Sequence, residues 1–303
     1  MPMAKAKPAD IAGEAKKTYI PYVDKMMPQW AARSYLYSDP ADLKVNNNSR
    51  FNRLRVAVID GDPLDVALDW YEANLNSASS LSYGSTTIDC PRIPVVNMAN
   101  EKRPGGDWES GLMAPEECLC RRTNLVQALT RPMDPYATYA HYPIPQMGGI
   151  YSPSVDTAVV YRSGPDRYQV WSEFKVLPVI SVAPVRRPKL DESGTRYSFE
   201  QEKELMKEKM RVILRIAIKH GHRNLCLGAF GVGNGFRNPV SEVAVMWREI
   251  LFNEPEFQGL LDNIVFAIES NPPGQGNDGA SNLQVFQNEF DPSTIFGTPY
   301  APM

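Results

Sequence analysis

The sequence has few cysteines, no excess of charge of one sign and no long apolar run. Its 303 residues include four cysteines (Cys90, Cys118, Cys120 and Cys226), and none forms a C-x-x-C pair. This usage argues against a disulfide framework and favours free thiols in a reducing compartment. The formal net charge is −3, so we expect no direct nucleic-acid binding through a broad basic face.

No stretch reaches the roughly eighteen apolar residues that a membrane-spanning helix requires. The first residues, MPMAKAKPADIAGEAKK, lack the apolar segment of a signal peptide. We therefore expect no membrane association and a cytoplasmic or nuclear localisation. The chain is 43% hydrophobic, which is enough to bury a sizeable core.

Composition divides the chain into four parts. Residues 1–16 are small, polar and lysine-rich, which is typical of a disordered tail. Residues 17–49 carry aromatic side chains interrupted by prolines and predict an N-terminal extension of short elements. We expect the main domain over 50–270. Residues 271–303 are rich in proline, glycine and asparagine and predict a surface tail.

Strand and helix patterns alternate along the main domain. Strands are predicted within 53–61, 93–100, 148–162, 168–184, 224–231 and 263–268. Helices are predicted from Pro63, from Pro115, from Ser198 (a capping box with Gln201) and over 240–252. This alternation predicts an α/β fold, in which ligands bind at the carboxyl ends of the strands.

Polar or glycine-rich segments follow three of these predicted strands. Asn97 and Asn100 end one strand, Gly105 and Gly106 lie in the loop after it, and residues 228–235 follow another. Three such strand ends in one sheet predict a binding site.

The segment GAFGVGNGFRNP lies between a predicted strand and a predicted helix. Its four glycines, Gly228, Gly231, Gly233 and Gly235, would leave backbone N–H groups open to an anion. The spacing matches neither G-x-G-x-x-G nor a Walker loop. A tight turn that requires positive φ explains one or two of the glycines, whereas phosphate binding explains all four.

Glu116 and Glu117 fall in the first turn of the helix predicted from Pro115. Successive helical residues point about 100° apart, so the two carboxylates would have different tasks. A helix start favours the ionised form, so a general acid here requires burial or a nearby phosphate to raise its pKa. The alternative is that both carboxylates only complement the helix dipole.

Other polar residues and the remaining cysteines give weaker indications of a functional site. His220 and His222 flank Gly221 at a predicted helix end, where cations suit the dipole, and no third metal ligand is evident. Cys118 and Cys120 are expected to pack in the interior. The pair Arg121–Arg122 is expected to be solvated, with contact of Arg121 to the edge of the site as an alternative.

Five motifs occur in a specific order: VVNMAN, RPGGDWESGLMAPEECLCRRTNL, GGIYSPSV, VISVAP and LGAFGVG followed by FRNP. Together they resemble the microbial-type poly(ADP-ribose) glycohydrolase family over about residues 55–270. The family pattern is GGG, seven residues and QEE; here Gly105-Gly106-Asp107, seven residues and Pro115-Glu116-Glu117 stand in that frame. The resemblance implies a macrodomain-like three-layer sandwich, with a central mixed β-sheet flanked by helices and an N-terminal helical extension.

The resemblance also implies that ADP-ribose lies across the top of the sheet, with no cofactor and no metal. Glu117 matches the catalytic glutamate and Glu116 the neighbour that anchors a ribose. The loop from Gly228 to Phe236 would hold the diphosphate, and Phe236 would pack on the distal ribose. The implied substrate-binding residues are Asn97, Asn100, Gly105, Gly106, Asp107, Gly228, Ala229, Phe230, Gly231, Val232, Gly233, Asn234, Gly235 and Phe236.

The sequence departs from the family pattern at several positions. Asp107 replaces the third glycine and adds a negative charge, and Pro115 replaces the glutamine and removes its amide. Val232 replaces a cysteine, in a loop one residue longer than usual. Proline costs little in a first helical turn, so the fold should tolerate it.

The function implied is hydrolysis of the O-glycosidic ribose–ribose linkages of ADP-ribose polymers, with Glu117 as general acid/base. Expected ligands are ADP-ribose, poly(ADP-ribose) and ADP-ribosylated proteins. One alternative is a non-catalytic ADP-ribose reader. Another is a mono-ADP-ribosyl-protein hydrolase retuned by Asp107 and Pro115, and a third is a hydrolase or binder of a different ADP-ribose derivative.

Overall fold

The computed structural model describes residues 7–27, 32–45, 53–81, 90–153, 159–163, 169–270 and 278–296. The chain divides into two compact units. The first unit comprises Met1–Asp42 and Tyr71–Ala183, and the second comprises Leu43–Trp70 and Pro184–Met303. Each unit is described by itself below.

The first unit contains a mixed four-stranded arrangement in the order β1-β4-β7-β3. Its strands are β1 (Tyr35–Tyr37), β3 (Val95–Met98), β4 (Gly149–Ser152) and β7 (Val179–Val182). β4 pairs antiparallel with β1 and β7, while β3 pairs parallel with β7 in a register that places Asn97 beside Ser181. β3 and β7 are fully buried, which explains their continuous apolar sequences.

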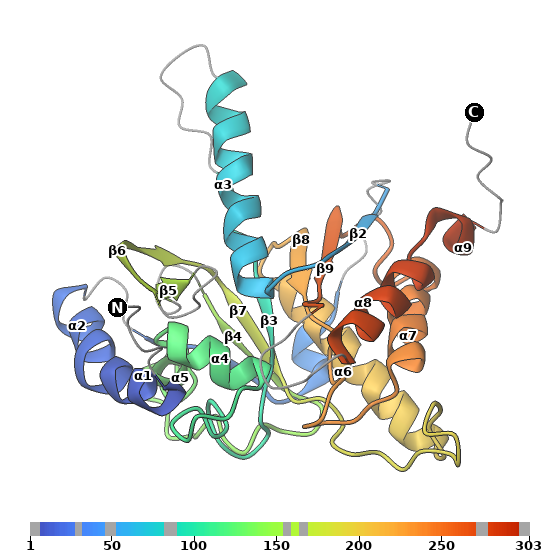
Figure 1. Ribbon diagram of the computed structural model, residues 1–303, viewed down its shortest axis with the longest axis horizontal. Helices are drawn as coiled ribbons and strands as arrows, with labels where there is room; N and C mark the ends of the chain where they lie inside the picture. The colour runs from blue at the N-terminus through green and yellow to red at the C-terminus, as the bar shows by residue number, and fades with distance from the viewer. Residues whose placement is uncertain are drawn as a thin grey trace, which may run out of the picture. The chain divides into compact units, whose positions relative to one another are not determined.

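A two-stranded antiparallel sheet and several helices complete this unit. The strands are β5 (Val159–Ser163) and β6 (Gln169–Val176), and the helices are α1 (Pro8–Glu14), η1 (Ala15–Tyr19), α2 (Ile20–Met26), α4 (Pro115–Arg122) and α5 (Leu125–Ala128). α1 contacts α4 (Figure 1). Tyr19 stacks on Tyr161 with ring centroids 5.0 Å apart, and Val23 joins a buried cluster with Val159 and Val176.

The expectation of a disordered tail over 1–16 is wrong for the residues described. Pro8–Glu14 is helical, and Ile11 and Ala12 are each 1% exposed. The helix has a short buried apolar face, which the high lysine content of this segment does not indicate. Because composition averages over the whole segment, it does not reveal that two single positions, Ile11 and Ala12, are buried.

The second unit contains three parallel strands in the order β8-β9-β2. They are β2 (Arg55–Ile59), β8 (Asn224–Leu227) and β9 (Asn263–Ala267), and the helices are α6 (Glu200–Lys219), α7 (Val240–Asn253), α8 (Asp278–Glu289) and α9 (Pro292–Phe296). The remaining elements are α3 (Pro63–Leu81), which crosses the boundary between the units, and the 3-10 turn η3 (Pro40–Leu43). α7 and α8 lie against each other (Figure 1).

The predicted surface tail over 271–303 is also wrong for its described part. Phe286 is fully buried and Phe290 is 6% exposed, and both rings pack on Phe266 of β9. Phe286 on α8 and Phe290 just after its end are four residues apart, and together they bring this segment into the core. Residues 271–277 and 297–303 lie outside the described residues.

The observed elements confirm the predicted α/β class with mixed strand pairing. The helix predicted from Ser198 begins instead at Glu200, and its N-cap, Phe199, makes no side-chain capping hydrogen bond. Across the described residues, no helix is both long and apolar enough to cross a membrane.

Candidate active site

The two glutamates lie at the start of α4, in the first unit. Ala114 is the extended N-cap residue and Pro115 occupies the first helical turn, where its missing N–H is not needed. Glu116 is 4% exposed and Glu117 is 7% exposed. Complementing a helix dipole does not require burial, so the dipole alone does not explain this arrangement.

Both carboxylate oxygens of Glu116 accept hydrogen bonds from the chain that leads out of β3. Oε1 accepts from Asn97 Nδ2 at 3.3 Å and from the backbone N–H of Gly105 at 3.2 Å. Oε2 accepts from the backbone N–H of Asn100 at 2.7 Å. Burial, reinforced by the charge of Glu117 and opposed by these three donors, raises the pKa of Glu116 to about 8.

Glu117 is held differently. Its Oε1 accepts the backbone N–H of Asp107 at 3.1 Å. Its other oxygen has no hydrogen-bond partner in the described parts of the chain. One oxygen is thus fixed by the protein and the other remains available, which is the arrangement that proton transfer to a ligand requires.

Gly105 and Gly106 are required by space and by backbone conformation. At Gly106, φ is +56°, and a Cβ would lie 2.4 Å from Glu117 Oε1 and 3.2 Å from Glu116 Oε2. At Gly105, φ is +73°, and a Cβ would lie 3.0 Å from Trp108 Cδ1 and 3.1 Å from Cys120 Sγ. The two glycines therefore allow the backbone to approach the carboxylates closely.

Three predicted ligand-binding residues contribute to this cluster in different ways. Asn97 is buried and also donates to Ser181 Oγ at 3.1 Å across the parallel register. The Asn100 side chain accepts the N–H groups of Lys102 and Arg103, so it shapes the loop, while its backbone N–H holds Glu116. Asp107 forms an ion pair with Arg103 at 2.9 Å.

The second predicted loop, residues 228–236, lies in the second unit after β8. Gly231 and Gly233 have φ of +75° and +101°. A Cβ at Gly231 would lie 2.7 Å from Met206 Cε and 2.8 Å from Asn238 Nδ2. By contrast, a Cβ at Gly235 would meet no atom within 4 Å.

The side chains of this loop face different surroundings. Phe230 is 1% exposed and its ring packs edge-on against Trp247, so only its backbone is left for a ligand. Asn234 and Gly235 are exposed, whereas Gly228 is buried and Ala229, Val232 and Phe236 are half-buried. The Phe236 carbonyl accepts the N–H of Arg187 at 2.6 Å, which fixes the end of the loop.

Tyr142 is a residue of the glutamate cluster that the sequence pattern did not reveal. Its hydroxyl is buried without a hydrogen-bond partner in the described structure. Burial raises the pKa of Tyr142 far above its usual range, and the charge of Glu116 adds to the effect. The segment is tied to the β3 loop because Ile144 N–H donates to the Glu101 carbonyl at 2.8 Å. No spacing rule connects residue 142 to residue 116.

The prediction that Arg121 and Arg122 are solvated is wrong. Arg121 is fully buried and Arg122 is 1% exposed. Arg121 Nε donates to the Trp108 carbonyl at 2.8 Å, and Arg122 Nε donates to the Arg162 carbonyl at 3.1 Å. Cys118 and Cys120 are buried free thiols, as predicted.

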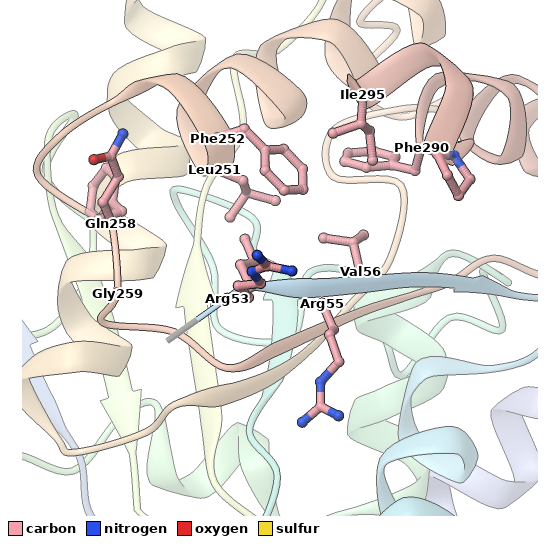
Figure 2. A pocket seen from close by; sticks show the side chains of 12 residues that line it. Arg53, Arg55, Val56, Leu251, Phe252, Gln258, Gly259, Phe290 and Ile295 are labelled. Carbon is pink, nitrogen blue, oxygen red and sulfur yellow. The ribbon is translucent and has the colours of Figure 1, made fainter. Parts of the chain in front are cut away.

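A separate pocket of about 810 Å³ lies in the second unit. Phe252, Phe257 and Phe290 line it together with Arg53 and Ile295, and Figure 2 shows Arg55 pointing away from the other side chains. The pocket is at the amino end of β2, whereas the 228–236 loop follows the carboxyl end of the parallel strand β8. None of the predicted site residues lines it. Within the described ranges, no group of three or more His, Cys, Asp or Glu side chains could hold a metal ion.

The comparisons with known proteins agree with the motifs. Residues 16–162 match the family model described as "Microbial-type PARG, catalytic domain", where PARG is poly(ADP-ribose) glycohydrolase. This segment contains Asn97, the two loop glycines and both glutamates. The resemblance to this family is therefore confirmed over just under half of the chain. No curated protein matches the chain.

Solved structures of the same kind cover nearly the whole chain. The poly(ADP-ribose) glycohydrolase of Thermomonospora curvata has 22% sequence identity and a TM-score of 0.68, over 93% of this chain and 99% of that one. The structure of the same enzyme bound to the inhibitor ADP-HPD has 23% sequence identity and a TM-score of 0.66, over 93% of this chain and 99% of that one. The Deinococcus radiodurans enzyme in complex with ADP-ribose has 24% sequence identity and a TM-score of 0.64, over 88% of this chain and 98% of that one. These similarities show a shared fold, the macrodomain-like α/β fold that the sequence predicted.

Proposed function

We propose that the protein is a glycohydrolase that cleaves the O-glycosidic ribose–ribose linkages of poly(ADP-ribose) and releases ADP-ribose. The observation that carries this proposal is the pair of buried carboxylates at the start of α4. Glu116 is held by three hydrogen-bond donors, and Glu117 is held through one oxygen only. The family match over 16–162, and relatives crystallised with ADP-ribose or ADP-HPD, support the same ligand class.

Glu117 is the general acid/base of this proposal. Its carboxyl proton passes to the glycosidic oxygen as the bond from that oxygen to the anomeric carbon breaks, leaving an oxocarbenium-like ribose. Water then adds to the anomeric carbon and gives a proton back to the Glu117 carboxylate, which restores the acid. One residue serves both steps because adjacent helical glutamates cannot flank a sugar from opposite faces, as paired glycosidase carboxylates do.

Glu116 and the asparagines position the ribose in this proposal. A Glu116 carboxyl whose pKa is near 8 carries a proton for much of the time at neutral pH. It can therefore donate a hydrogen bond to a sugar oxygen, and it adds no negative charge beside the Glu117 carboxylate that forms when the acid gives up its proton. The 228–236 loop is proposed to bind the diphosphate through its backbone N–H groups.

The departures at Asp107 and Pro115 leave the helix start and the backbone contact to Glu117 intact, which favours an active enzyme over a reader. Asp107 supplies its backbone N–H to Glu117, and that contact does not depend on the side chain. Pro115 occupies a position where the helix needs no donor. The second candidate, a mono-ADP-ribosyl-protein hydrolase, is favoured by the Asp107 charge, which makes this loop more acidic than an all-glycine loop.

The test measures release of ADP-ribose from poly(ADP-ribose) and from a mono-ADP-ribosylated protein, by wild type and Glu117→Gln. We expect release from the polymer, and a fall of about 10²- to 10⁴-fold in the variant, as is typical for loss of a general acid/base. Release from the mono-modified protein alone would support the second candidate. Tight ADP-ribose binding without release from either substrate would indicate a reader. The cytoplasmic or nuclear localisation expected from the sequence remains a prediction.

A further inference from the structure

Arg121 is a fully buried arginine without an ion-pair partner among the described residues. It follows Glu117 by one helical turn on α4, so the two side chains lie on the same face of that helix. A buried cation is costly unless hydrogen bonds compensate for its lost hydration. The hydrogen bonds of Arg121 therefore indicate why the chain keeps a charge at this position.

Both acceptors of Arg121 belong to the 105–113 loop, which precedes α4. Nε donates to the Trp108 carbonyl at 2.8 Å, and Nη1 lies 3.7 Å from Met113 Sδ. The guanidinium thus reaches back from the end of the helix and holds the middle and the end of the loop. A planar, multi-donor side chain is suited to fixing two acceptors at once.

The loop passes this constraint on to the glutamates through its backbone. The Trp108 N–H donates to the Gly105 carbonyl at 3.1 Å. The Gly105 N–H in turn donates to Glu116, and the Asp107 N–H donates to Glu117. Trp108 is 5% exposed and packs against Gly105, so a shift of Trp108 would move both amides.

We propose that Arg121 is a positioning residue, which holds the 105–113 loop so that its amides orient the carboxylates of Glu116 and Glu117. The consequence for turnover rests on the glycohydrolase function proposed above, whereas the consequence for the order of the loop does not. Arg121 itself touches neither glutamate through a hydrogen bond or ion pair in the described structure. It acts through the loop.

Arg122 provides a matched control. It is the same residue type on the same helix and is equally buried, but its Nε donates to the Arg162 carbonyl of β5. Arg122→Met and Arg121→Met each remove one buried guanidinium and keep an unbranched apolar stem. Only Arg121→Met releases the 105–113 loop.

The experiment combines amide hydrogen exchange over 101–113, the melting temperature, and kcat for ADP-ribose release from poly(ADP-ribose). We expect Arg121→Met to speed exchange in this loop by about tenfold or more, because local opening becomes easier. We expect kcat to fall about 10- to 100-fold, since small displacements of a catalytic group are costly. Arg122→Met should lower the melting temperature similarly but leave loop exchange and kcat within about threefold of wild type, because it contacts another element.

Equal effects of the two methionine variants on exchange and kcat would overturn the proposal, since Arg121 would then only support the fold. If Arg121→Met does not fold, Arg121→Lys replaces it. Its donors all lie on one nitrogen, so it does not reproduce the two separate nitrogens through which Arg121 holds the loop. Unchanged exchange and kcat in Arg121→Lys would also overturn the proposal. If wild type releases no ADP-ribose, the proposed function fails, and loop exchange alone decides the role of Arg121.

Discussion

The two glycine-rich loops of this protein differ in how far packing and backbone conformation require their glycines. In the 105–113 loop of the first unit, Gly105 and Gly106 have positive φ and leave no room for a side chain. In the 228–236 loop of the second unit, Gly231 meets both conditions, whereas a Cβ added at Gly235 would have no neighbour within 4 Å. Packing therefore explains the glycine pair beside the glutamates fully and the glycines of the second loop only in part.

This difference shows where substitutions are tolerated. Around the glutamates, backbone N–H groups make most of the contacts, so the side chain at position 107 can change without loss of the hydrogen bond to Glu117. In the second loop, packing does not explain Gly235, and our hypothesis is that a ligand approaches the backbone there closely. The predictions below test this contrast.

Gly106→Ala should give the largest effect. The new Cβ would lie 2.4 Å from Glu117 Oε1, on a residue with φ of +56°. We expect turnover to fall about 100-fold because the carboxylate is displaced. Gly13→Ala is the control, since a Cβ there meets no atom within 4 Å. Turnover of Gly106→Ala within about threefold of that control would show that the glutamate geometry does not limit the reaction.

Gly231→Ala should destabilise the second unit by about 2 kcal/mol, because it overpacks a buried turn. Gly235→Ala should change the free energy of unfolding by less than about 0.5 kcal/mol, as most exposed substitutions do. Chemical denaturation measures both values. Calorimetric titration of Gly235→Ala with ADP-ribose then tests the ligand-based reason for this glycine. Unchanged affinity would argue against it.

Glu116→Gln should change how stability depends on pH. Burial raises the pKa of Glu116 from 4.5 to about 8 in the folded protein, so the folded state holds its proton more tightly than the unfolded state does. This contribution is complete below pH 4.5 and is lost as the pH rises to about 8. The stability of the variant relative to wild type should therefore rise over that interval by up to a few kcal/mol and stay constant above it. Denaturation curves with parallel pH dependence would contradict the raised pKa.

Asp107→Gly should give the smallest effect. It restores the third glycine of the family pattern and removes an exposed ion pair with Arg103, a kind of pair that contributes about 0.2–1 kcal/mol. Because the backbone N–H remains, we expect kcat on poly(ADP-ribose) to stay within about threefold of wild type. A large gain on the polymer, with a loss on mono-ADP-ribosylated protein, would instead identify Asp107 as a specificity determinant.

Periodicity predicted most of the regular elements. Buried strands such as β3 and β9, and helices such as α4 and α7, occur where the apolar patterns and Pro115 placed them. The ends of the chain were predicted poorly. Ile11 and Phe286 are each part of a short apolar face within a polar segment, and tertiary packing decides their burial.

The candidate site was predictable where residues are close in sequence or belong to a family motif. Gly105, Gly106, Glu116 and Glu117 meet in the structure as their spacing suggested. Neither Tyr142 nor the buried state of Arg121 was predicted. The tyrosine reaches the cluster from a distant loop, and the arginine has the sequence context of a solvated pair. Charge patterns in sequence cannot distinguish an exposed arginine from a buried one that binds carbonyl groups.

The packing of the N-terminal helices has a consequence for how this domain is delimited. The family match begins at residue 16, yet Glu14 pairs at 2.6 Å with Arg162, whose side chain is 5% exposed. A chain that began at residue 16 would lose the Glu14 carboxylate that pairs with this buried arginine and would uncover the face of α4 that α1 contacts. The boundary of sequence similarity therefore falls inside the first compact unit, and the residues before it pack on the helix that carries Glu116 and Glu117.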